Sequence, residues 1–298
     1  MSDSHTPVGA GRATPAAASP VPRSAGRAGE RRPARYTARA LGRSIGLALR
    51  GRHAHDAEGR AAWTAALAVL RAADQVFSTD RFSSAVSRLG RGELALVDCP
   101  PEVAEVLALG AAVTRDSSGA FDVYRAGGLG EEVFDPSAVV PGWAAERAAA
   151  PLRALADTDF CLSVGGDLVW RTRDPAGPFG EPGARDRRDA RQWGDEPPRR
   201  SGAVATSGPA RGGRRVVDAR TGQPASGIVA VTVVAATLTE ACLDATAAHT
   251  LGHEAADWLR TRPGRTGRVA WTDGTTTTVR NGTAVRTSGV GVLSGAAT

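Results

Sequence analysis

The sequence of 298 residues predicts an α+β fold in which a mixed sheet, flanked by helices, ends in a β-meander. Three observations predict this class. A long segment near residue 60 has apolar residues at helical spacing. Strand-like runs alternate with helical ones along the middle of the chain. Near the C-terminus, two turn dipeptides separate three short strand-like segments.

Helices are predicted at three places. The first runs from Asp56 to Phe77, where one apolar stripe recurs every three or four residues. The second opens at Pro101, a residue that suits the first helical turn, and ends before Gly119. The third opens near Pro141 and is disturbed at Pro151, because proline lacks the N–H of a helical hydrogen bond. The first stripe consists of Trp63, Leu67, Leu70 and Phe77.

Strands are predicted where β-branched and apolar residues form short runs, at 44–49, 160–170 and 228–234. The meander comprises 268–272, 275–280 and 283–287. Asp273-Gly274 and Asn281-Gly282 separate its strands, and both pairs are typical of type I′ hairpin turns.

Composition sets the limits of the domain. Residues 1–37 are rich in Arg, Pro and Ala and are expected to form a disordered tail, which leaves 38–298 as one domain. The segment 171–200 has almost no aliphatic residues and is expected to be a flexible loop. Hydrophobic residues make up 42% of the chain and aromatic ones only 5%, so the core should consist mainly of Ala, Val and Leu.

Charge and cysteine content exclude several classes of protein. The formal net charge is +6, but the arginine runs lie in Pro- and Gly-rich stretches with few aromatic neighbours, so no nucleic-acid partner is expected. Three distant cysteines without a CxxC pair fit a reducing compartment. No signal peptide and no apolar run of membrane-spanning length is found, which predicts a cytoplasmic protein.

Five short segments place small residues beside a carboxylate or hydroxyl, as a backbone that approaches a phosphate or a metal requires. Each segment alone is typical of a turn or a loop end. Their order and spacing together make the pattern more specific. They are 118–122, 134–143, 164–167, 205–208 and 216–222.

In this order the segments resemble the ApbE-type FAD:protein FMN transferases, over about residues 38–260. Residues 119–122 look like the Gly-Ala-Phe-Asp element, and 77–89 is similar to an early Ser-Thr and Ser-x-x-Ser-Arg stretch. The resemblance assigns catalysis to Asp218 and Thr246, and magnesium to Ala138, Asp244 and Thr246. It assigns FAD to Leu41, Asp80, Gly119, Ala120, Phe121, Asp122, Asp135, Pro141, Gly165, Gly166, Asp167, Thr206, Ser207, Gly208 and Val217.

The resemblance implies a reaction and its partners. Aided by Mg2+, the enzyme would cleave the pyrophosphate of FAD and attach FMN to a Thr or Ser of an acceptor flavoprotein, releasing AMP. The alternative is a relative that binds FAD but has lost transfer, and that acts as a flavin carrier or has no activity.

Four positions depart from the family pattern: Asp80, Pro141, Arg215 and Cys242. The last matters most, because Cys242 stands where the Asp-x-x-x-Thr pair of the metal helix has its aspartate, and a thiolate is a poor magnesium ligand. Asp244 or Glu240 could replace it, or Asp244 could be a surface carboxylate. His249 and His253, one turn apart, are expected to lie on a helix face.

Overall fold

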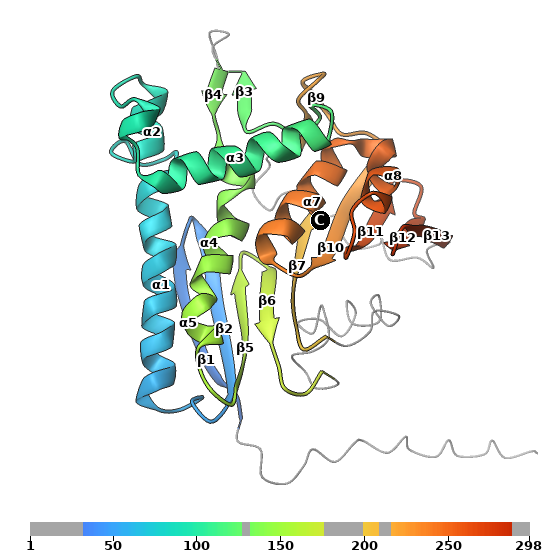
Figure 1. Ribbon diagram of the computed structural model, residues 1–298. Coiled ribbons are helices and arrows are strands. Elements are labelled where there is room, and N and C mark those ends of the chain that lie inside the picture. The colour runs from blue at the N-terminus through green and yellow to red at the C-terminus, as the bar shows by residue number, and fades with distance from the viewer. Residues whose placement is uncertain (1–31, 127–131, 176–198, 209–215, 288–298) are drawn as a thin grey trace, which may run out of the picture. The chain divides into compact units, whose positions relative to one another are not determined.

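The computed structural model describes residues 32–126, 132–175, 199–208 and 216–287 (Figure 1). The chain divides into a unit of residues 1–32 and a unit of residues 33–298, and the second unit contains the fold. Most of the predicted tail lies outside the described residues. Residues 34–37, however, already belong to the first strand, so the fold begins before the expected residue 38.

The second unit is built on a nine-stranded sheet whose order is β1-β2-β5-β6-β7-β10-β11-β12-β13. Every ladder between these strands is antiparallel, so the α+β class is confirmed but the expected mixed sheet is wrong. Two small two-stranded sheets, β3-β4 and β8-β9, lie beside it. The strands of the large sheet are β1 (Ala34–Ala40), β2 (Arg43–Gly51), β5 (Thr158–Val164), β6 (Asp167–Arg171), β7 (Ser201–Ser207), β10 (Ile228–Ala235), β11 (Thr266–Trp271), β12 (Thr276–Arg280) and β13 (Thr283–Thr287). The small sheets comprise β3 (Tyr124–Ala126), β4 (Glu132–Phe134), β8 (Val217–Asp218) and β9 (Gln223–Pro224).

The strand expected at 160–170 is a hairpin of β5 and β6. Gly165 and Gly166 separate the two strands, with φ of +66° and +116°. Residues with a side chain rarely adopt such φ angles, whereas glycine does so without strain. The two adjacent glycines therefore turn the chain where hydrophobicity alone indicated one strand.

The C-terminal meander is confirmed as β11, β12 and β13, with one different turn. Asn281 and Gly282 both have positive φ, as a type I′ turn requires. At the other turn only Gly274 has positive φ, and the Trp271 N–H donates to the Thr275 carbonyl across three intervening residues. The first turn is thus a longer loop closed by a glycine.

The predicted helices are all present. Asp56 caps α1 by accepting a hydrogen bond from the Gly59 N–H at 3.0 Å. The helix near Pro141 is interrupted before Pro151, as expected, and becomes α4 and α5. The helices are α1 (Ala57–Phe77), α2 (Ala85–Gly90), α3 (Pro101–Asp116), α4 (Val140–Ala148), α5 (Ala150–Arg153), α7 (Leu238–Thr250) and α8 (Ala255–Arg260). Short 3-10 helices lie at Leu96–Asp98, Pro136–Ala138 and Gly252–Glu254.

One helix packs on the sheet, and two further helices pack beside it in turn. Helix α7 lies on β7 and β10, α4 packs against α7, and α1 packs against α4 (Figure 1). The core between them consists largely of Ala, Val and Leu. The rings of Phe77 and Trp143 pack edge to face in it, with their centroids 5.4 Å apart. Along β6 the side chains alternate between the two faces of the sheet, so that Val169 joins this core while Leu168 and Trp170 are buried in a small cluster on the other face. None of the helices among the described residues is both long and apolar enough to cross a membrane.

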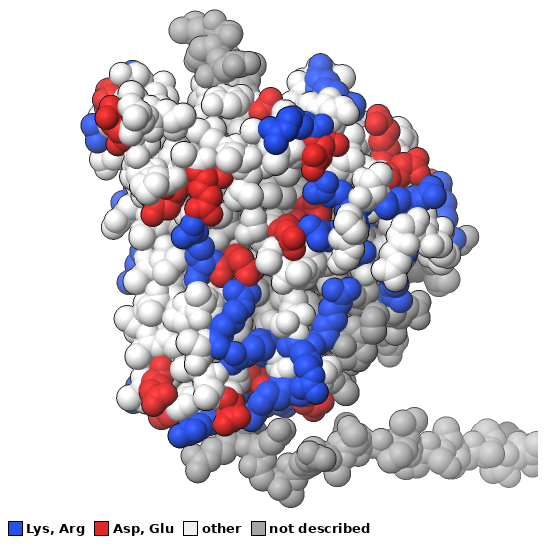
Figure 2. Space-filling model, viewed as in Figure 1, with Lys and Arg blue, Asp and Glu red and all other residues white. Residues whose placement is uncertain are grey.

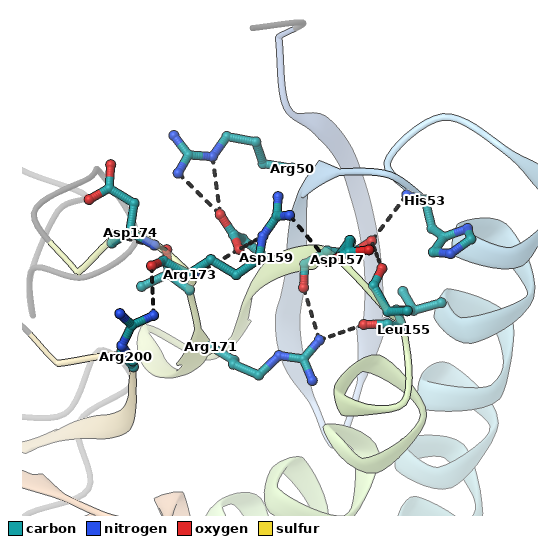
Figure 3. Close-up of polar contacts among 12 residues, drawn as sticks. Arg50, His53, Leu155, Asp157, Asp159, Arg171, Arg173, Asp174 and Arg200 are labelled. Carbon is teal, nitrogen blue, oxygen red and sulfur yellow. Dashed lines mark hydrogen bonds and ion pairs between the residues drawn. The ribbon is translucent and has the colours of Figure 1, made fainter.

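The edge of the sheet where β2 and β6 end is held by arginines. Arg50 and Arg173 both bind the buried carboxylate of Asp159, and Arg171 donates to the carbonyls of Leu155 and Thr158 (Figure 3). Figure 2 shows a band of basic side chains on one face of the molecule, with acidic groups beside it. The arginines drawn in Figure 3 therefore bind carboxylate and carbonyl groups of the protein itself.

Candidate functional site

The opposite edge of the sheet gathers the small-residue segments. Here β2 begins at Arg43, β5 ends before Gly165, β6 begins at Asp167 and β7 ends at Ser207. Because antiparallel neighbours bring the end of one strand beside the start of the next, segments far apart in sequence meet. The predicted 165–167 and 206–208 segments thus adjoin.

Asp167 is the carboxylate at the centre of this edge. Its Oδ1 accepts a hydrogen bond from the Thr206 N–H at 3.0 Å, and its Oδ2 lies 3.7 Å from the Cys242 Sγ, which donates to it. Burial raises the pKa of Asp167, while the Thr206 N–H and the charge of Arg43 oppose this rise. The carboxylate therefore connects β6, β7 and α7.

Helix α7 presents Cys242 and Thr246 to this site. It begins with a capping box, in which Thr237 and Glu240 each accept the other's backbone N–H at 3.2 Å. Residues 242 and 246 are four apart and so share a face. Cys242 is packed so closely on α4 that a Cβ at Gly142 would lie 2.8 Å from its sulfur.

Asp244 faces away from that pair. Its two carboxylate oxygens bind Arg265 at 2.7 Å and Arg262 at 3.3 Å, and its side chain is only 2% exposed. Burial raises the pKa of Asp244, and the two guanidinium groups oppose that rise. Glu240 also binds Arg265, at 3.1 Å. Asp244 is therefore not a surface carboxylate. Asp244 and Glu240, the two carboxylates that could have replaced the aspartate missing at 242, are both paired with arginines.

Backbone hydrogen bonds link the remaining segments. The Ala219 N–H donates to the Ala120 carbonyl at 2.9 Å, which joins the Gly-Ala-Phe-Asp element to 218–222. The Asp135 N–H donates to the Val123 carbonyl at 2.7 Å, which joins 119–122 to the start of 134–143. Gly142 in the latter packs against Cys242, whose thiol donates to Asp167, so helix α7 connects these segments to 164–167 and 205–208.

Asp218 is held by its own segment. Arg220 binds both of its oxygens, with Nη2 at 2.7 Å from Oδ2, and this bond holds the pKa of Asp218 below its usual range. The carboxylate is thus ionised at neutral pH. Beside it, Val217 is partly exposed in β8.

The other predicted positions are distributed differently. Ala120 and Phe121 are buried, whereas Asp122 is exposed and accepts the Tyr124 N–H at 2.9 Å. Ala138 and Pro141 lie at the entry to α4. Asp80 is exposed between α1 and α2 and takes no part in the bonds that connect the five segments. Arg215 lies outside the described residues.

One pair was missed by the sequence analysis. His249 lies on a face of α7, as expected, whereas His253 belongs to the following 3-10 helix. His249 is buried, and its Nδ1 lies 3.2 Å from the Ser207 Oγ, a contact that was not predicted. Burial lowers the pKa of His249, which keeps the ring neutral at pH 7. Its spacing from Cys242 and Thr246, at seven and three residues, was the available signal that it shares their face.

The residues at this edge do not fit magnesium. Mg2+ binds oxygen ligands and commonly uses one or two carboxylates. Here the Cys242 thiol offers a proton to Asp167 instead of a lone pair, and burial raises the pKa of the thiol well above its usual range. Within the described ranges, no group of three or more His, Cys, Asp or Glu side chains is placed to hold a metal.

Comparison with known proteins agrees with this architecture of an antiparallel sheet, packed helices and a glycine-rich edge. Residues 130–269 of the chain match the model of the ApbE family. No curated protein matches the chain.

Solved structures share the fold over most of their length. A flavinyl transferase ApbE from Pseudomonas stutzeri, in the apo form, is 20% identical, with a TM-score of 0.64 and coverage of 88% of this chain and 96% of that one. The ApbE protein of Thermotoga maritima is 18% identical, with a TM-score of 0.61 and coverage of 82% and 96%. The flavin transferase ApbE of Vibrio cholerae is 15% identical, with a TM-score of 0.62 and coverage of 87% and 98%.

Proposed function

We propose that this chain binds FAD at the glycine-rich edge and transfers its FMN half to a Thr or Ser hydroxyl of an acceptor protein, with AMP as the leaving group. The family match and the flavin transferases among the similar structures support this proposal. The observation that carries it is that the five segments are connected, by backbone hydrogen bonds and through Asp167 and Cys242, because such small-residue segments let a backbone approach a phosphate.

The chemistry assigned to the chain is positioning. The oxygen of the acceptor hydroxyl bonds to the FMN phosphorus as the pyrophosphate P–O bond breaks; AMP leaves with the bonding electron pair, and the hydroxyl proton passes to solvent. Asp218, an ionised carboxylate paired with Arg220, accepts a hydrogen bond from the attacking hydroxyl and orients it. The Thr246 hydroxyl, on the face of α7 next to Cys242, donates to a phosphate oxygen.

A second candidate is a relative that binds FAD without transferring FMN. It is favoured by the two contacts at α7 that leave no carboxylate free for a metal: the Cys242 thiol on Asp167, and the arginines on Asp244. These contacts leave the glycine-rich segments intact. This candidate therefore predicts FAD binding with no turnover.

One incubation separates the two candidates. The purified chain, with FAD and a Thr-containing peptide, is expected to release AMP and to yield a flavinylated peptide, measured by chromatography and mass spectrometry. Asp218→Asn keeps the shape of the side chain but removes its charge, and it should reduce turnover about tenfold to a hundredfold while FAD binding changes less. FAD binding without AMP would favour the second candidate, and absence of FAD binding would contradict both.

A further inference from the structure

We propose that Arg43 supplies the positive charge that binds the phosphates of FAD at this edge, in place of a divalent cation. This inference rests on the proposed function. It concerns how a pyrophosphate is held where the residues of α7 do not suit magnesium.

Arg43 is positioned by the tight turn between β1 and β2. Leu41 and Gly42 have φ of +53° and +64°, so the turn contains a non-glycine residue in the left-handed region. Such residues cluster at functional sites, because the surrounding structure must compensate for the strain. The turn sets Arg43 as the first residue of β2, directly at the edge where β5 ends.

The Arg43 side chain lies against the Gly-Gly turn. A Cβ at Gly165 would be 2.8 Å from the Arg43 Nη1 and 3.0 Å from its Cδ. Any other residue at 165 would therefore displace the guanidinium. Gly165 thus turns the chain and also leaves room for an arginine beside Asp167.

Arg43 is exposed, and no described carboxylate lies within the 4 Å of an ion pair with it. At the opposite edge, by contrast, Arg50 and Arg173 share Asp159 (Figure 3). The charge of Arg43 still reaches the site, where it acts against the rise in pKa of both Asp167 and Cys242. The edge therefore holds a cation that is in ion-pair contact with no carboxylate of the described residues.

A guanidinium is suited to this task. Its planar N–H groups bind two phosphate oxygens at once, and it keeps its charge at any physiological pH. A bound pyrophosphate would meet this charge next to the backbone of two glycines. Both carboxylate oxygens of Asp167 already accept hydrogen bonds, from the Thr206 N–H and the Cys242 thiol, so the guanidinium remains available to the phosphates.

Titration of the full chain with FAD and with riboflavin, each in Mg2+ and in EDTA, tests this role. Wild type should bind FAD equally well in both buffers, within about threefold. Arg43→Ala should weaken FAD binding about tenfold to a hundredfold, as expected for a lost charge-assisted hydrogen bond, and leave riboflavin binding unchanged. Arg43→Lys should fall between the two.

Arg39→Ala is the matched control. Arg39 lies opposite Ser44 in the same strand pair and is exposed, but it is on the other side of that pair from Arg43. The Arg39→Ala substitution also removes one positive charge, but it should change the affinity for FAD and the affinity for riboflavin by no more than about twofold. A requirement of wild type for Mg2+, an Arg43→Ala variant that binds FAD normally, or an equal loss of FAD and riboflavin affinity would each overturn the inference. Failure of wild type to bind FAD in either buffer would overturn the proposed function as well.

Discussion

Replacing Asp244 with alanine is expected to lower the free energy of unfolding by about 2–4 kcal/mol, as removal of one partner from a buried ion pair does. The variant would leave Arg262 and Arg265 without the carboxylate that both bind. The loss of stability stays below the upper limit for such pairs because each arginine retains a second ion pair in the variant. Arg262 still binds Asp116 at 2.7 Å, and Arg265 still binds Glu240. Urea unfolding, followed by circular dichroism, measures the change.

Asp257→Ala provides the comparison. Asp257 also pairs with an arginine, Arg260 at 3.4 Å, but its side chain is 81% exposed. An exposed pair of this kind contributes little to stability, so this variant should unfold like wild type. If Asp244→Ala were equally silent, the arginines would not hold this carboxylate, and Asp244 would again be a candidate metal ligand.

Replacing Cys242 with aspartate is expected to create a magnesium site that wild type lacks. The new carboxylate would lie beside Asp167, whose Oδ2 is 3.7 Å from the present sulfur, and on one helical face with Thr246. Two neighbouring carboxylates repel each other, which destabilises the metal-free protein. Millimolar Mg2+ should therefore raise the melting temperature of this variant by several degrees, because it binds only the folded state.

Cys242→Asn has a similar volume and no charge, so its melting temperature should not respond to Mg2+. Wild type should not respond either. A folded Cys242→Asp variant that ignores Mg2+ would mean that this edge cannot hold the ion even with two carboxylates. A Mg2+ response in wild type as large as in the variant would contradict the conclusion that the thiol prevents metal binding.

Local signals were enough to predict much of the fold. The cap at Asp56 and the apolar stripe behind it define α1, and Asn281-Gly282 defines the last hairpin. The antiparallel order of the sheet could not be predicted, because strand pairing depends on contacts between residues far apart in sequence. The Gly165-Gly166 hairpin was not predicted for a different reason. The apolar residues on both sides of the two glycines were interpreted as one continuous strand over 160–170.

The candidate site was predictable as segments but not as contacts. Glycines beside a carboxylate marked 165–167 in the sequence, and a glycine beside hydroxyls marked 206–208; the structure brings these segments together at Asp167. The partners of Asp244 are 18 and 21 residues away, and no local pattern relates them to it. The same holds for Arg43, which reaches Gly165 only because β2 pairs with β5.

The central claim is that this edge recognises a flavin dinucleotide, and one titration tests it most directly. Wild type, followed by flavin fluorescence, should bind FAD about tenfold more tightly than FMN, and FMN at least as tightly as riboflavin, because each added phosphate meets backbone and charge at the glycine-rich segments. Equal affinity for FAD, FMN and riboflavin would contradict the account, since the phosphates would then contribute nothing to binding.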